Sequence, residues 1–94
     1  MTRTLSLTFR LTGLVADVDE TTPDESRHPA LALIIECGDD LARVVILASV
    51  WPPEKRELLA VDQPVAATGE SNIDPLLPGA RAVATSLQLL DSYH

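Results

Sequence analysis

Cationic and aromatic side chains are the groups in this 94-residue chain whose chemistry could serve a binding site. Arginine and lysine contact phosphate oxygens, and an aromatic ring is a platform on which a base of a single strand can stack. The residues with this potential are Arg3, Arg10, Arg43, Trp51, Lys55, Arg56 and Arg81. Each also has an ordinary interpretation, since the arginines could be solvated surface residues and Trp51 could pack beneath a helix.

Net charge opposes nucleic-acid binding by the surface as a whole, because the chain carries −7 at neutral pH. Tight binding to a polyanion draws on a positive surface, so any basic footprint must be local. Acidic residues concentrate in segment 17–26, which reads DVDETTPDES and would repel phosphate. That acidic loop suits docking on a basic partner protein, and a solvated loop without a partner is the alternative.

Catalytic chemistry has little support in the residue pattern. His28 and His94 have no serine or cysteine partner at a recognisable spacing, and the sequence has no glycine-rich phosphate loop. Cys37 is the single cysteine, which excludes an internal disulfide, and we expect it to be a small buried hydrophobe. Asp39 and Asp40 are predicted to form a turn. We therefore expect no enzyme activity, no metal site and no cofactor.

The elements that must position these residues are mostly strands. Segment 2–19 alternates, with Leu5, Leu7, Phe9 and Leu11 on one face, which predicts a half-buried strand. Gly13 inside it predicts a bulge or bend, and the apolar residues beyond Gly13 fall on both faces, so one strand could serve two sheets. Segments 30–38 and 41–50 predict a hairpin, with its turn at Asp39–Asp40.

The second half of the chain predicts a helix between strands. Segment 52–62 opens with two prolines and has Leu58, Leu59 and Val61 as a small apolar face. Segments 64–70 and 80–91 predict two more strands, with Pro64 at a strand start or edge. Strand, strand, strand, helix, strand, strand is the order of the OB-fold, an all-β five-stranded barrel with one short helix between strands 3 and 4. Another small β-barrel or an α+β sandwich is the alternative.

Apolar residues on both faces of the second and third strands predict a covered outer surface, and a second copy of the chain is the simplest cover. The loop SNIDPLLPG at 71–79 also carries leucines that could either mark a contact or fold back over the barrel end. The predicted interface residues are Ile34, Val44, Ile46, Leu76 and Leu77.

Residues 43–90 resemble the single-stranded-DNA-binding protein family, including its small primosomal OB proteins. RVVILASVWPPEKRELLAVDQPVAATGE is similar to that family's third strand, aromatic residue, helix and fourth strand ending in glycine, and ARAVATSLQLL to its last strand. LTGLVADVD resembles its first strand. The resemblance implies an OB-fold that binds single-stranded DNA. The chain departs from the family in having VDQP where a Lys-Gly usually precedes the fourth strand.

Two hypotheses follow for a single OB-fold domain over residues 1–94. The first is a homo-oligomeric single-stranded-DNA-binding protein of replication, repair or recombination, which the resemblance favours. The second is an OB-fold protein-interaction or assembly subunit that binds no nucleic acid, which the composition favours. The apolar runs are too short to span a bilayer and the chain opens without a secretory pattern, so we expect a cytoplasmic protein.

Overall fold

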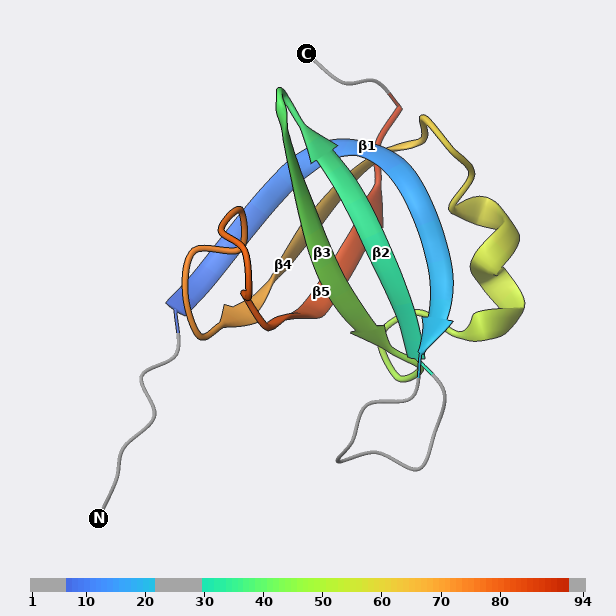
Figure 1. Ribbon diagram of the computed structural model, residues 1–94. Helices are drawn as coiled ribbons and strands as arrows, with labels where there is room; N and C mark the ends of the chain where they lie inside the picture. The colour runs from blue at the N-terminus through green and yellow to red at the C-terminus, as the bar shows by residue number, and fades with distance from the viewer. Residues whose placement is uncertain (1–6, 22–29, 92–94) are drawn as a thin grey trace.

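The computed structural model of the protein describes residues 7–21 and 30–91, which form five strands and one short helix (Figure 1). These elements are β1 (Leu7–Thr21), β2 (Ala30–Cys37), β3 (Asp40–Leu47), the 3-10 helix η1 (Pro53–Leu58), β4 (Pro64–Ser71) and β5 (Ala82–Leu89). The strands close into a barrel in the order β1-β2-β3-β5-β4. This is the OB-fold, as predicted from the order of the elements.

Strand β1 joins the two halves of the barrel. Its first part, Leu7–Leu14, pairs with β4, and its second part, Leu14–Thr21, pairs with β2. The prediction that one long strand serves two sets of partners is therefore confirmed. Figure 1 shows β1 curving over the other strands from end to end, as this double pairing requires.

Gly13 lies where β1 passes from β4 to β2. A Cβ atom at this position would overlap the carbonyl oxygen of Glu36 and would lie 2.9 Å from Cγ2 of Ile35. The residue therefore permits a close approach of two backbones. The irregular register that was expected at Gly13 lies instead between Val15 and Asp17, in the pairing with β2.

The hairpin of β2 and β3 turns at Gly38–Asp39, and not at Asp39–Asp40 as the sequence suggested. Cys37 pairs with Asp40, which leaves a two-residue loop whose first residue, Gly38, has a φ of 65°. Two-residue hairpin turns favour glycine at such a position because a Cβ atom disfavours positive φ. Strand β3 then ends at Leu47, whose carbonyl accepts hydrogen bonds from the amides of Val50 and Trp51 and so begins a turn.

The core lies between the inner faces of β2 and β3 and the strands facing them. Val44 and Ile46 point into this core and are 0% exposed. Their predicted place at a protein interface is therefore wrong. From Ala42 onward the even-numbered residues of β3 face inward. Its outer face carries the odd-numbered residues Leu41, Arg43, Val45 and Leu47.

Helix η1 is shorter than predicted and contributes little to the core. Leu59, directly after it, is 3% exposed and packs within the core, while Leu58 and Val61 are exposed. The predicted three-residue apolar face is therefore reduced to one residue. Helix η1 ends at Leu58, so Leu59 and Val61 lie in the turn that follows it and no single helical face carries all three residues.

Truncation of Leu59 tests this packing. We expect Leu59→Ala to lower the free energy of unfolding by about 2–3 kcal/mol, because it leaves a cavity under the helix. Leu58→Ala, at the exposed neighbour, should change it by no more than about 0.5 kcal/mol. Urea denaturation of both variants, followed by Trp51 fluorescence, makes the comparison. Equal losses would contradict the packing seen here.

Candidate binding surface on the outer face of the barrel

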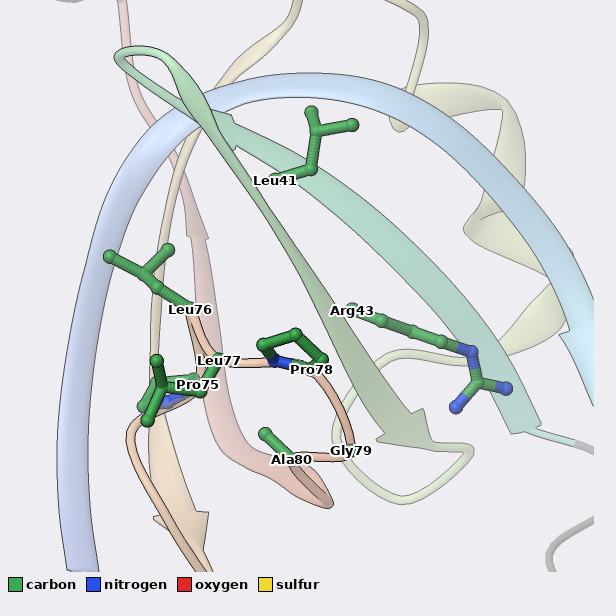
Figure 2. Close-up of a pocket in the computed structure, with 8 residues that line it drawn as sticks. All are labelled: Leu41, Arg43, Pro75, Leu76, Leu77, Pro78, Gly79 and Ala80. Atoms are coloured by element: carbon green, nitrogen blue, oxygen red, sulfur yellow. The ribbon is translucent and has the colours of Figure 1, made fainter.

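A groove runs between β3 and the loop that joins β4 to β5. It has a volume of roughly 400 Å³ and is lined by Leu41, Arg43, Pro75, Leu76, Leu77, Pro78, Gly79 and Ala80. Figure 2 shows the loop residues along one side of β3, while the guanidinium of Arg43 extends toward β2. OB-folds bind oligonucleotides and oligosaccharides on the face of strands 2 and 3 and between neighbouring loops, so the groove lies at a surface suited to ligands.

The loop is held in place by its own polar residues. Oδ1 of Asn72 accepts hydrogen bonds from the amides of Ile73 at 3.0 Å and Arg81 at 2.7 Å, which ties the two ends of the loop together. Oδ1 of Asp74 accepts from the amide of Leu76 at 3.0 Å, and its carbonyl accepts from Leu77 at 2.9 Å. These Asx-type contacts give the groove a defined wall.

The two loop leucines have different environments. Leu76 is half-buried and packs against the core, while Leu77 is 53% exposed. The packing alternative therefore describes Leu76, and a contact at Leu77 stays a prediction. Leu76 folds back over the barrel, and Leu77 remains available for contact.

Apolar side chains continue from Leu77 over the outer face of β2, β3 and β5. Leu41 is 60% exposed, and Leu47 and Val83 are also exposed. Val45 pairs with Val83 across β3 and β5, so the side chains lie next to one another in the sheet. We define the outer patch as Ile34, Leu41, Val45, Leu47, Leu77 and Val83. Of the predicted interface residues, Ile34 and Leu77 belong to it.

Two of the predicted cationic residues lie at the edge of this patch. Val44 and Ala82 form the first pair of the β3–β5 ladder, and Arg43 and Arg81 directly precede that pair on their two strands. Both arginines are exposed. Within the described residues the ion pair that forms joins Arg56 to Glu20, which leaves Arg43 and Arg81 without an ion-pair partner there.

The other predicted cationic residues lie elsewhere. Arg10 is paired with Thr68 of β4, and β1 is not a direct neighbour of β3 in the barrel. Arg56 donates to the carbonyl of Val18 at 2.9 Å and lies 3.6 Å from the carboxylate of Glu20. Arg3 lies outside the described residues. The structure thus divides the basic positions that the sequence grouped together.

Trp51 belongs to the helix end of the barrel. Its Nε1 donates a hydrogen bond to the carbonyl of Lys55 at 3.0 Å, and its half-buried ring packs against the core. Phe9, the other described aromatic residue, also packs there. This arrangement favours the packing interpretation of Trp51, and base stacking by its ring stays a prediction without support from the geometry.

The predicted acidic loop is partly a strand. Residues 17–21 are part of β1, so the segment 17–26 is not all loop, and its remainder lies outside the described residues.

Cys37 is half-buried. Burial of the thiol and, to a lesser degree, the charge of Asp40 raise its pKa, which disfavours the thiolate. Within residues 7–21 and 30–91, no cluster of His, Cys, Asp and Glu could hold a metal ion.

No helix in the part of the chain that the structure describes is long and apolar enough to cross a membrane.

Comparison with known proteins shows the fold alone. No family model and no curated protein matches the sequence. A chain of the Stn1-Ten1 complex of S. pombe is similar in structure, with a TM-score of 0.64 and 17% identity over 90% of this chain and 59% of that chain. Asparaginyl-tRNA synthetase from Pyrococcus horikoshii, complexed with asparaginyl-adenylate, is similar with a TM-score of 0.62 and 18% identity. That match covers 92% of this chain and 19% of the synthetase.

Proposed function

We propose that this protein is an OB-fold interaction module that docks another polypeptide on the outer patch. The observation that carries the proposal is the exposure of Leu41 and Leu77 where they line the groove, with Val83 also exposed on β5. Contiguous exposed apolar surface marks interaction sites, because burying it on association is favourable. Complete burial of one leucine side chain contributes about 1.5–3 kcal/mol.

The same surface is poorly suited to a nucleic-acid strand. Binding of single strands combines a positive groove with aromatic platforms. Both described aromatic residues pack against the core, and of the predicted cationic residues in the described part of the chain Arg43 alone lines the groove. The total charge of −7 adds a repulsive background. These features favour a polypeptide over a polyanion as the ligand.

Single-stranded DNA is the second candidate ligand, and it is favoured by the exposed Arg43 and Arg81, which directly precede the first pair of the β3–β5 ladder. Several copies in a homo-oligomer would bring more such pairs to one strand, which is the arrangement that a role in replication, repair or recombination would need. Two phosphate contacts per chain imply a slope of log K against log salt of about −1.4 for each chain. Binding of this kind weakens steeply as salt rises.

Site-specific photocrosslinking separates the two candidates. A benzophenone side chain is placed at Leu77 and, as a matched control, at Gln88, which is exposed on β5 outside the patch. In the cells that make the protein, we expect a discrete polypeptide adduct from Leu77 and none from Gln88. Mass spectrometry identifies the adduct, including a second copy of this chain, and the purified pair must then bind in solution.

Anisotropy of labelled oligo-dT at low and moderate salt completes the test. We expect no binding by the isolated protein, even at low salt. Salt-sensitive binding that Arg43→Ala weakens and Arg10→Ala does not, together with no adduct from Leu77, would contradict docking and support the nucleic-acid candidate. Arg10 is the appropriate control because it is also an exposed strand arginine.

A further inference from the structure

The edge of β3 is open beside the groove. Its ladder with β5 comprises the pairs Val44–Ala82, Val45–Val83 and Ile46–Ala84. Before Ala82 the chain leaves β3 and forms the wall of the groove instead. Residues 40–43 of β3 therefore have β2 on one side and the groove on the other, over a length of about 13 Å.

The hairpin geometry determines which backbone groups face the groove. A two-residue turn is closed by a hydrogen-bonded pair, here Cys37 and Asp40, and such pairs alternate with non-hydrogen-bonded pairs along an antiparallel ladder. Leu41 and Arg43 belong to non-hydrogen-bonded pairs, so their backbone amides point away from β2. Val45 also belongs to such a pair, and its backbone pairs with β5, which agrees with this assignment.

These groups have no partner from the loop. Among the described residues, no hydrogen bond from loop backbone or from a side chain reaches the amide or carbonyl of Leu41 or the amide of Arg43. An open strand edge of this kind is a template for pairing with another chain. A nucleic-acid strand has no backbone ladder with which to satisfy it.

We propose that the groove binds an extended segment of a partner polypeptide, which adds a short strand to the edge of β3 at residues 40–43. This inference rests on the proposed function and specifies how the partner binds. Main-chain hydrogen bonds supply affinity in strand addition, and alternate side chains supply specificity. The leucines and prolines of the groove wall select apolar side chains in the added strand.

The exposed Arg43 defines a second feature of the partner. It lines the groove and lies opposite Ile34 on β2, so its positive charge has an apolar neighbour across the hairpin rather than an acidic one. Glu36 lies opposite Leu41, and no ion pair joins it to Arg43 within the described residues. An acidic side chain or a terminal carboxylate in the partner strand would complement Arg43.

Amide hydrogen exchange tests the open edge in the protein by itself. We expect the amides of Leu41 and Arg43 to exchange at least about tenfold faster than those of Ala42 and Val44, which face β2. Equal protection at all four positions would overturn the inference, because the edge would then already be paired.

A random dodecapeptide library displayed on phage supplies the probe for binding. We expect enriched peptides to alternate apolar residues, to contain an acid, and to slow exchange at Leu41 and Arg43 by about tenfold or more. Methylating alternate backbone nitrogens of the peptide should weaken binding by about tenfold, while methylating the intervening ones should not. Peptides that bind without protecting these amides would overturn strand addition.

Leu77→Asp distinguishes failure of this inference from failure of the proposed function. Peptides whose binding is lost in Leu77→Asp but which leave the β3 amides unprotected would retain docking and overturn strand addition. A library that yields no binding peptide, or only peptides that Leu77→Asp does not affect, would overturn both. If no peptide bound and oligo-dT instead changed the exchange of the Leu41 and Arg43 amides, both strand addition and polypeptide docking would be overturned, in favour of a groove that binds nucleic acid.

Discussion

Replacing Gly13 with alanine should lower the free energy of unfolding by about 3 kcal/mol or more. The added methyl group would overlap the carbonyl oxygen of Glu36 and would lie 3.0 Å from its carbonyl carbon, and both are backbone atoms that cannot rotate away. Relief requires β1 and β2 to separate where β1 changes its partner strand. A small domain has only about 5–15 kcal/mol of stability, so the loss removes much of it.

Gly38→Ala is the matched control for Gly13→Ala. Nothing lies within 4 Å of a Cβ atom at Gly38, so alanine there meets only the cost of its positive φ, about 1 kcal/mol. Urea denaturation followed by far-UV circular dichroism compares the two variants with the parent protein. A Gly13→Ala variant that loses no more stability than Gly38→Ala would contradict the close approach of β1 and β2.

Trp51→Ala should destabilise the fold by about 2–3 kcal/mol. Removal of a fully buried tryptophan costs about 3–5 kcal/mol, and the ring of Trp51 is half-buried. The variant also removes the hydrogen bond from Nε1 to the carbonyl of Lys55 at the end of the barrel that η1 occupies. Urea denaturation followed by circular dichroism measures the change, since the variant lacks the fluorescent side chain.

Trp51→Phe separates the contribution of ring packing to stability from that of the Nε1 hydrogen bond. Measuring ligand binding by the same variant tests whether the ring also stacks on a ligand. Phenylalanine keeps most of the apolar ring and loses the N–H donor, so we expect a loss of about 1 kcal/mol. Binding to the outer patch should be unchanged in Trp51→Phe, because the ring lies at the helix end of the barrel. A variant that is as stable as the parent protein but has lost affinity for a ligand would restore Trp51 as a binding residue.

The candidate site was only partly visible in the residue pattern. Ile34, Arg43, Leu77 and Arg81 were singled out from the sequence, and the structure places them on or beside one surface. Leu41 and Val83 were not singled out. The position of Leu41 directly after the predicted turn at Asp39–Asp40 could have indicated that its side chain is exposed. The basic residues could not be grouped correctly, because their proximity depends on which strands become neighbours.

The sequence by itself determined the order of the elements and the inner face of β1. Alternation of apolar and polar residues identifies the buried side of a strand when only one side is apolar, and Phe9 and Leu11 do pack inward, although Leu7 at the start of the strand is 48% exposed. Proline at Pro64 likewise marked the beginning of β4, because proline cannot donate a ladder hydrogen bond. These are local properties, and local physics suffices for them.

Tertiary structure alone decided the inner face of β3 and the identity of the patch. Both faces of β3 are rich in apolar residues, so periodicity could not distinguish buried Val44 and Ile46 from exposed Leu41. Closure of the barrel determines which face of β3 is buried, because it pairs β3 with β5 over the residues from Val44 to Ile46. That pairing joins segments distant in the chain, and it leaves the edge of β3 before Val44 open to the groove.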